Sequence, residues 1–185
     1  LPYKRVKGLK EWNFGTFEGE SEDLNPPLPY KDFFVTYGGE SQDQVQERMA
    51  TTILQLMQET DGQSVLMVSH GGAMANFARA WQKNWCLDDL GHMTNCGILK
   101  FTFEDDQFYL EEAIGQMKDL YLMRHGQTFF NQEGLVQGAC DSPLTELGQD
   151  QVRQAGAYLQ ERGIRFGPLY SSTQERASDT LELVS

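Results

Sequence analysis

Two histidines in this chain each follow a short apolar run. His125 comes after Leu120–Met123 and Arg124, and His70 comes after Ser64–Ser69. Continuous apolar runs of this length indicate strands that are buried on both faces. Open α/β sheets bind ligands at the carboxyl ends of such strands. We therefore expect both imidazoles to lie at a ligand-binding edge of one sheet.

Two further segments carry residue types that complement these histidines. Pro168–Ser171 reads as a third strand and is followed by Arg176 in the first turn of a helix, while the glycine-rich stretch Leu9–Gly19 holds Glu11 and Glu18. Arginine binds phosphoryl oxygens through its planar fork. A neutral imidazole can attack phosphorus when its other nitrogen is held by an acceptor, and a carboxylate can protonate the departing oxygen and then activate water. Together these residue types point to phosphoryl transfer.

The segments between these strands show the periodicity of helices. Val45, Met49 and Ile53 fall on one face of a helix that begins with a Ser41-x-x-Gln44 capping box. Three more helices are predicted by similar stripes, at Met74, Phe77 and Trp81, at Val152, Ala155 and Leu159, and at Ala177, Leu181 and Val184 after Gln174.

Strands that alternate with helices predict an α/β fold, here a three-layer α/β/α sandwich around a mostly parallel sheet. Gly97–Phe103 and Gln107–Leu110 flank an acidic turn and predict a hairpin at the sheet edge. The least regular stretch, Glu20–Gly39, reads as a long loop or lid over a site. Its aromatic residues are equally suited to packing and to substrate selection; they are Tyr30, Phe33, Phe34 and Tyr37.

The composition bounds the class of protein. A length of 185 residues, with 39% hydrophobic and 23% charged residues, predicts a single globular domain. A formal net charge of −12 argues against nucleic acid or an anionic membrane as a partner, but a few arginines can still make a local pocket for a small anion. The chain has three cysteines, an odd number, and they lack Cys-x-x-Cys spacing. We therefore expect neither a disulfide framework nor a structural zinc site. No signal peptide or membrane-spanning run is recognisable, so we expect a cytoplasmic protein; its oligomeric state is left open.

Several separated motifs resemble those of the histidine phosphatase superfamily, also called the phosphoglycerate mutase-like family. The resemblance covers most of the chain. The motifs are Leu122–Thr128 with Asn131, Gln137 and Gly138; Asp141–Thr145 with Gly148; Tyr170–Ala177 with Thr180; Glu11 with Phe14, Gly15 and Phe17–Gly19; and Val68–Gly71.

The resemblance implies a role for each matching residue. It makes His125 the nucleophile that becomes phosphohistidine and Glu11 the general acid and base, while Glu18 is expected to be structural. The phosphate pocket is formed by Arg124, Arg176 and His70, and the expected substrate contacts are Asn131, Gln137, Gly138 and Gly71. The resemblance implies no metal and no other cofactor.

Three functions are compatible with these residues. The first is a phosphomonoester hydrolase that acts on a small phosphorylated metabolite. The second is a phosphoglycerate mutase, which would return the phosphoryl group to a substrate hydroxyl; the chain is short and lacks the long insertion of the mutases it resembles. The third is a binding module that has kept the fold and lost turnover, which the intact set of site residues argues against.

The motifs stand in an unexpected order. In the family that the chain resembles, the Arg-His-Gly motif comes first and the second histidine last, whereas here His70 precedes His125. This order predicts a circular permutation of one domain spanning 1–185. Residues 1–114 then resemble the family's C-terminal part, 115–116 a link, and 117–185 its N-terminal part. Three origins explain this order: a natural rearrangement, an engineered one, or an artefact in which the two segments were written in the wrong order.

Overall fold

A computed structural model of the protein describes residues 3–60, 64–81, 94–110 and 118–185. In this part of the chain, six strands form one sheet with the order β1-β6-β2-β5-β3-β4. Strands β1, β6, β2 and β5 are parallel to one another, and β3 is antiparallel to both β5 and β4. The strands are β1 (Tyr3–Arg5), β2 (Val65–Ser69), β3 (Ile98–Glu104), β4 (Gln107–Leu110), β5 (Lys118–Arg124) and β6 (Leu169–Ser171).

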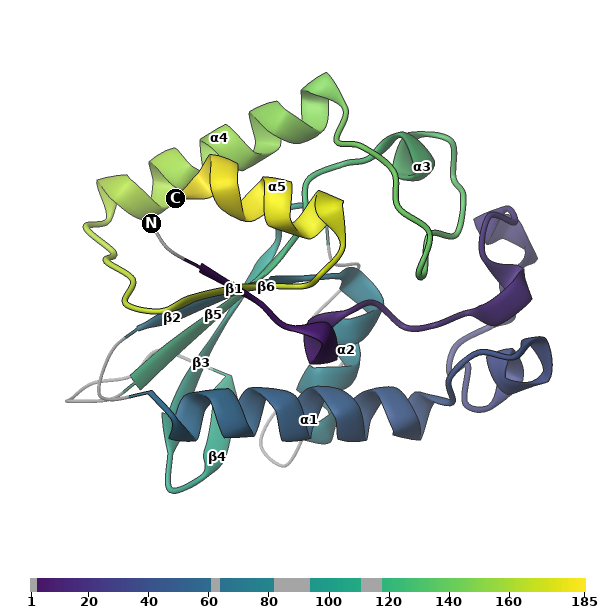
Figure 1. Cartoon of the computed structure of the whole chain (residues 1–185), viewed down its shortest axis with the longest axis horizontal. Helices are drawn as coiled ribbons and strands as arrows, with labels where there is room; N and C mark the ends of the chain where they lie inside the picture. The colour runs from purple at the N-terminus through teal and green to yellow at the C-terminus, as the bar shows by residue number, and fades with distance from the viewer. Residues whose placement is uncertain (1–2, 61–63, 82–93, 111–117) are drawn as a thin grey trace.

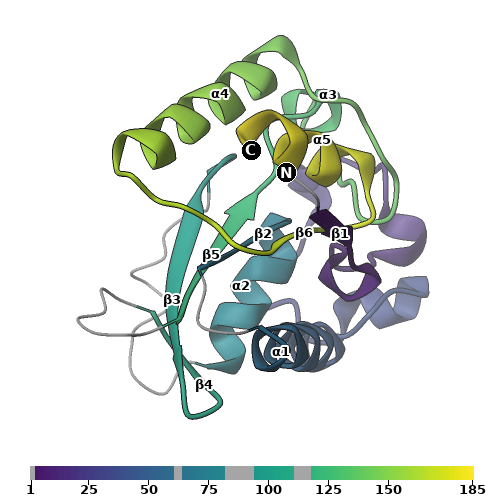
Figure 2. The ribbon, with the colours of Figure 1, turned by 60° about the vertical axis from the view of Figure 1, so that its left-hand side comes forward.

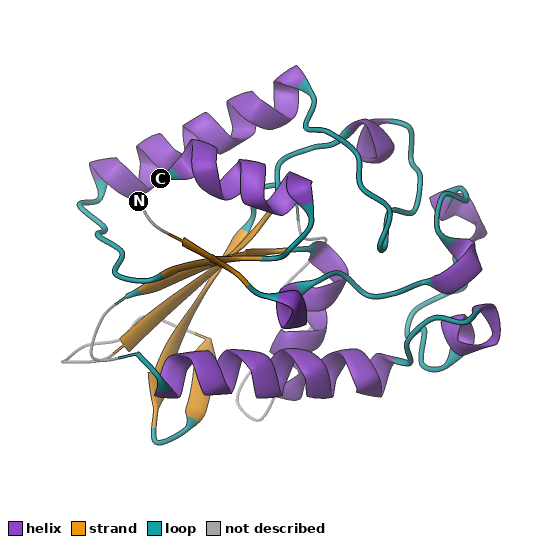
Figure 3. Ribbon diagram, in the orientation of Figure 1, coloured by secondary structure: helices purple, strands orange, loops and turns teal. Residues whose placement is uncertain are grey.

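Helices cover both faces of this sheet (Figures 1 and 3). Helices α1 (Gln42–Gln58) and α2 (Gly71–Ala80) pack together on one face, and α4 (Glu146–Glu161) and α5 (Glu175–Val184) pack together on the other. Figure 2 shows the two pairs on opposite sides of the twisted sheet. The predicted three-layer α/β/α architecture is confirmed.

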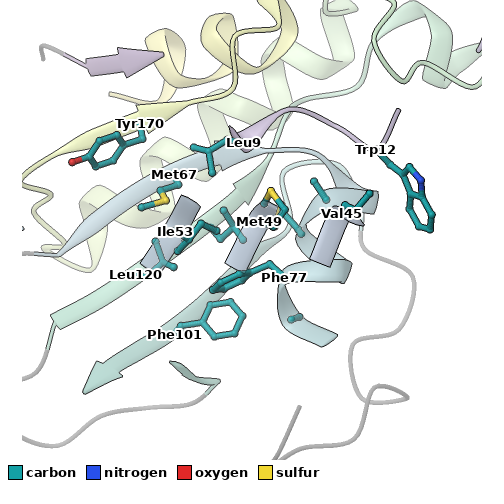
Figure 4. Packing of buried hydrophobic residues seen from close by; sticks show 14 of the residues in the cluster. Leu9, Trp12, Val45, Met49, Ile53, Met67, Phe77, Phe101, Leu120 and Tyr170 are labelled. Atoms are coloured by element: carbon teal, nitrogen blue, oxygen red, sulfur yellow. The ribbon is translucent and has the colours of Figure 1, made fainter. Parts of the chain in front are cut away.

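The central strands build two cores because their side chains alternate between the faces. In β2, Val65 and Met67 join the cluster on the α1–α2 side, whereas Leu66 and Val68 join the cluster on the α4–α5 side. All five residues of β2 are buried. Figure 4 shows the first cluster, where Met49, Ile53, Phe77, Phe101 and Leu120 are among the residues with no exposed surface. The buried apolar runs of the sequence thus mark the centre of the sheet.

Local signals set the helix boundaries. Helix α1 begins at the predicted capping box, in which the Ser41 hydroxyl accepts from the Gln44 N–H and the Gln44 side chain accepts from the Ser41 N–H. Helix α4 begins at Thr145, whose hydroxyl accepts from the Gly148 N–H at 3.0 Å. Helix α5 begins after Gln174, as predicted.

Two elements at the periphery differ from the expectation. Strand β1 was not predicted, because two of its three residues, Lys4 and Arg5, are charged and exposed, as is common at a sheet edge. The short helix α3 (Phe129–Gln132) was also missed. Within the expected loop Glu20–Gly39 lie two 3₁₀ turns, η3 (Glu22–Leu24) and η4 (Phe33–Tyr37). Two others precede it, η1 (Lys7–Leu9) and η2 (Gly15–Phe17).

The parallel strands end at one edge of the sheet. Ser69 at the end of β2 pairs with Arg124 at the end of β5, and Val68 pairs with Ser171 at the end of β6. This register places the residues that follow β2, β5 and β6 side by side. The predicted link 115–116 lies outside the described residues. Within the described ranges, no helix combines the length and apolar character needed to cross a membrane.

The contact between α4 and the β5–α3 connection gives a test of the fold. A Cβ atom on Gly148 would lie 2.1 Å from the carbonyl oxygen of Gln127, whereas one on Gly156 in the same helix would lie 3.3 Å from its nearest neighbour. We expect Gly148→Ala to lower the free energy of unfolding by about 1–3 kcal/mol through overpacking, although alanine favours a helix. Urea denaturation measures the change.

Gly156→Ala is the matched control, since it makes the same chemical change in the same helix. We expect it to change the free energy of unfolding by about 1 kcal/mol or less. Equal stabilities of the two variants would show that the close packing of Gly148 against Gln127 is wrong.

Candidate active site

His125 follows β5, and its ring is held in one tautomer. Its backbone N–H donates to the carbonyl of Ser69 at 3.1 Å, and Nδ1 lies 2.7 Å from the carbonyl oxygen of Gly126. A carbonyl only accepts, so Nδ1 carries the proton and Nε2 keeps its lone pair. The Gly126 peptide is itself fixed, because its N–H donates to the Thr180 hydroxyl at 3.0 Å. The ring is only 2% exposed, with Nε2 directed toward Arg176 Nε at 3.3 Å.

The surroundings of both histidines favour the neutral imidazole. Burial, and then the charges of Arg176 and Arg124, lower the pKa of His125 well below its usual 6.5 despite the Gly126 carbonyl. Burial is also the largest cause that lowers the pKa of His70, followed by Arg176 and His125. Near neutral pH the Nε2 lone pair of His125 is therefore available as a nucleophile.

His70 is a fully buried side chain next to His125. It follows β2 as the N-cap of α2, and its ring centroid lies 5.2 Å from that of His125. Neither of its ring nitrogens makes a hydrogen bond to any described residue. Buried polar groups are nearly always paired, so this imidazole has the character of a group that binds a ligand.

Arg176 brings a fully buried guanidinium beside His125. Nη1 donates to the carbonyl of Cys140 at 2.8 Å and to Oδ1 of Asp141 at 3.0 Å, and Nη2 donates to the carbonyl of Gly138 at 2.9 Å. Burial lowers the pKa of Arg176, and the Asp141 charge opposes that shift. The side chain remains a cation, fixed in place with Nε toward Nε2 of His125.

Arg124, the last residue of β5, supplies a second guanidinium. Burial lowers its pKa, and the nearby Glu11 carboxylate opposes the shift, so the group remains charged. The first turn of α2 packs closely on it, since a Cβ atom on Gly71 would lie 3.3 Å from Cζ of Arg124. Arg124 and Arg176 thus place two positive charges around His125.

The Glu11 carboxylate lies at the N-terminus of α2. Oε1 accepts from the N–H of Ala73 at 2.7 Å and of Trp12 at 2.8 Å, and Oε2 accepts from the N–H of Gly72 at 3.2 Å. Helix N-termini favour negative charge. Gly72 is required for this approach, because a Cβ atom there would lie 2.8 Å from Oε1.

Arg48 from α1 positions the Glu11 segment, a role that the sequence did not reveal. Its guanidinium donates to the carbonyls of Gly8, Lys10 and Glu11 at 2.8–3.2 Å and to both carboxylate oxygens of Glu40 at 2.9 Å. Burial acts to raise the pKa of Glu40, but Arg48 outweighs it and holds the pKa below its usual value. These bonds fix the backbone that carries the expected proton donor.

Gln174 and Asp141 were also missed as positioning residues, although both lie in quoted motifs. Gln174 Oε1 accepts from the Glu11 N–H at 3.2 Å, and its amide nitrogen donates to the Gly138 carbonyl. The Asp141 carboxylate accepts from the Glu175 and Arg176 N–H groups at the start of α5. These contacts join segments that are far apart in sequence, so no local pattern could have found them.

The expected substrate contacts surround the same space. Asn131 Oδ1 accepts from Asn95 at 3.2 Å, and no described residue accepts from the Asn131 amide nitrogen. Gln137 donates to the Thr128 hydroxyl at 2.7 Å, so its amide nitrogen is already engaged within the protein. All of the predicted site residues except the deeper His70 line one cavity; they are Glu11, Gly71, Arg124, His125, Asn131, Gln137, Gly138 and Arg176. Glu18 lies outside this lining, and its carboxylate accepts from the N–H groups of Phe14 and Cys140.

The cavity has a volume of about 830 Å³ and an aromatic wall. Tyr30, Trp12 and Phe14 line it, whereas Phe34 is fully buried in the core. Phe33 and Tyr37 pack on Phe17, with ring centroids at 5.8 and 5.2 Å. The expected lid is therefore divided, with Tyr30 facing the cavity and the other three aromatic residues of the lid used for packing.

The family of the chain follows from its sequence. The sequence pattern of the histidine phosphatase superfamily (branch 1) matches residues 1–114 and 120–185. The chain belongs to this superfamily. Phosphatases and phosphoglycerate mutases are both found among the curated proteins that it resembles.

Curated relatives of two kinds are similar to parts of the chain. A broad-specificity phosphatase of Saccharomyces cerevisiae is 34% identical over 42% of this chain and 34% of its own length. A 2,3-bisphosphoglycerate-dependent phosphoglycerate mutase of Rhizobium etli is 45% identical over 35% of this chain and 31% of its own length. The chain thus spans about a third of the length of these relatives. No solved structure matches it.

The described residues contain no group of three or more histidine, cysteine, aspartate or glutamate side chains arranged to hold a metal ion. Arg124 and Arg176, which flank His125, concentrate positive charge at the site. This arrangement can bind a phosphate through positive charge and through N–H donors on fixed side chains.

The low pKa values of the two site histidines can be tested directly. Because burial and two arginines disfavour the imidazolium, His125 and His70 stay neutral when the pH falls to 6.5 and become protonated only below it. NMR titration of the histidine ring protons from pH 8 to pH 5 measures this. The variants His125→Gln and His70→Gln assign the two signals, and a midpoint at or above 6.5 for either ring would contradict the site described.

Proposed function

We propose that the protein is a phosphomonoester hydrolase that acts on a small phosphorylated metabolite through a phosphohistidine at His125. The observation that carries the proposal is the state of the His125 ring. Its Nδ1 proton is bound to the Gly126 carbonyl, and its unprotonated Nε2 accepts only a long hydrogen bond of 3.3 Å from Arg176 Nε, beside the cavity that both residues line. This is the arrangement that a nitrogen nucleophile requires.

In the first step, Nε2 of His125 attacks phosphorus and the bond from phosphorus to the ester oxygen breaks. Glu11, in its protonated form, gives its proton to the departing oxygen, so an alcohol leaves. Arg124 and Arg176 offset the charge on the phosphoryl oxygens. One N–H of His70, whose ring nitrogens bond to none of the described residues, donates to a phosphoryl oxygen. The fixed partners of Arg176 mean that little rearrangement is needed.

In the second step, water attacks the phosphohistidine. Glu11 is now a carboxylate and removes a proton from this water as the bond between phosphorus and Nε2 breaks. Inorganic phosphate leaves, His125 returns to its neutral form, and Glu11 is protonated again. The N-terminus of α2, which donates to Glu11 through Gly72 and Ala73, keeps the carboxylate in place throughout.

Phosphoglycerate mutase activity is the second candidate, and the mutases among the curated relatives favour it. In that reaction, a substrate hydroxyl replaces water in the second step. Transfer of phosphate from 2,3-bisphosphoglycerate to monophosphoglycerate that outpaces hydrolysis would assign the chain to this candidate. A binding module without turnover would show neither activity.

The hydrolase proposal predicts the effect of removing the nucleophile. With an aryl phosphate as substrate, we expect His125→Gln to reduce kcat to background, because no other described side chain in the site offers a nitrogen lone pair held in this way. Glu11→Gln should lower kcat by about 10²–10⁴-fold for an ester with a poor leaving group. Steady-state kinetics and thermal unfolding are measured on each variant.

Leaving-group dependence provides the control. An ester whose alcohol is strongly acidic needs little protonation, so Glu11→Gln should affect its first step much less. Hydrolysis by folded His125→Gln at the wild-type rate would refute the proposed nucleophile.

We also propose that the single domain is circularly permuted, with residues 1–114 corresponding to the family's C-terminal part and 117–185 to its N-terminal part. The order of the motifs supports this, and so does the arrangement in space. Strand β1 lies beside β6, and the Tyr3 hydroxyl donates to Glu182 at 2.7 Å, so the first strand and the last helix meet (Figure 1). A short connection could join them.

A reordered chain tests this proposal. It would carry residues 117–185, a short glycine-serine linker and then residues 1–114. We expect the same far-ultraviolet circular dichroism and a kcat within about 3-fold of the present chain, because the site depends on geometry rather than on chain order. An unfolded reordered chain beside a folded and active present chain would contradict the permutation.

A further inference from the structure

One arginine in the cavity has no role in the steps described above. Arg79, near the end of α2, lines the same cavity as His125 and is half-buried. Burial lowers its pKa and nearby Tyr30 opposes the shift, and the guanidinium remains a cation. A partly desolvated cation at a cavity wall requires an explanation.

Arg79 also differs from the other two arginines of the cavity in its partners. Arg176 is paired with Asp141, and Arg124 lies near Glu11. Among the described residues, no carboxylate forms an ion pair with Arg79, and its hydrogen bond is a long one of 3.5 Å to the amide oxygen of Asn76. Its guanidinium therefore has donors left for an anion.

The helix places Arg79 at a definite distance from the phosphoryl site. Gly72, Asn76 and Arg79 recur at helical spacing and all line the cavity, so they form one face of α2. Arg79 lies two turns beyond Gly72, roughly 10 Å along the helix axis. Helical side chains lean toward the helix N-terminus, which directs Arg79 toward the end of α2 that begins at His70.

Two other titratable groups lie at this wall. Glu22 is exposed on the lid and also lines the cavity; its charge acts on Tyr30 and Arg124, and no effect of it on Arg79 is resolved. Burial and Glu22 raise the pKa of Tyr30, so its hydroxyl stays protonated and can donate a hydrogen bond. Apolar surface from Phe14 and Pro29 completes the wall.

We propose that Arg79, with Tyr30, binds a second anionic group on the substrate, a carboxylate or a second phosphate, while the phosphoryl group lies at His125. The substrate class is then a phosphomonoester that carries a remote negative charge, separated from the phosphorus by a spacer of several atoms. This inference rests on the proposed function for the position of the phosphoryl group. It adds a specificity-determining residue that takes no part in bond breaking.

Binding of non-hydrolysable phosphonates tests the inference without requiring turnover. The probes are alkylphosphonates with spacers of two to six carbons, the same compounds with a terminal carboxylate, and the corresponding bisphosphonates, each measured by calorimetry. We expect the best-matched probe with a second anionic group to bind wild type about 10-fold more tightly than its alkyl counterpart. The probe series with the larger gain in affinity, the carboxylates or the bisphosphonates, identifies whether the second group is a carboxylate or a phosphate.

The variants separate recognition from folding. Arg79→Gln should remove this gain and leave the affinity for plain alkylphosphonates unchanged, and Arg79→Lys should keep part of it. Arg153→Gln, a surface arginine on α4, is the matched control and should keep the whole gain. If no probe gains from its second charge, or if Arg79→Gln keeps the gain, the inference is overturned.

The two proposals fail in different ways. If wild type hydrolyses an aryl phosphate but the second charge brings no gain in binding, the role of Arg79 is wrong and the hydrolase proposal stands. If the gain is present and is lost in Arg79→Gln while no phosphate ester is hydrolysed, the second-anion site stands and the proposed function fails.

Discussion

The burial of the Arg176 guanidinium is the constraint on which the site depends. A fully buried charge is tolerated only when its donors are satisfied, and here the partners are the carbonyls of Gly138 and Cys140, the Asp141 carboxylate and Nε2 of His125. These partners come from the loop before α4 and from the end of β5, and the arginine itself comes from α5. One buried cation therefore fixes the relative positions of three segments. Its Nε lies beside Nε2 of His125, the atom proposed to attack phosphorus.

A second set of contacts holds Glu11, the proposed proton carrier. The Glu11 segment has little regular structure, so its position depends on side chains that bind its backbone. Arg48 binds three of its carbonyls, the Ser69 hydroxyl donates to the carbonyl of Leu9 at 2.8 Å, and Gln174 accepts from the Glu11 N–H. His125 is thus held by Arg176 of α5, and Glu11 by Arg48 of α1 together with Gln174 before α5; the two side chains meet at the carboxyl edge of the sheet.

Much of this arrangement could be predicted from the sequence. The buried strands could be predicted from continuous apolar runs such as Val65–Ser69, and the start of α1 from its capping box, because both signals are local in sequence. Strand β1 could not be found, since an edge strand needs little apolar surface. Arg48 and Gln174 could not be found either, because they act on backbone groups of distant segments. The roles of the aromatic residues in the lid could not be predicted for a similar reason. Only tertiary packing distinguishes Tyr30, which faces the cavity, from Phe34, which is buried in the core.

The central claim is that a neutral His125 takes the phosphoryl group on Nε2, and trapping that intermediate tests it most directly. The enzyme would be mixed rapidly with a phosphate ester and quenched in alkaline detergent, which preserves phosphohistidine, before peptide mass spectrometry. The account predicts phosphate on His125 of the wild type, labile to acid, with greater occupancy when the second step is slowed. Phosphate on another residue, or turnover in which His125 stays unmodified, would contradict it.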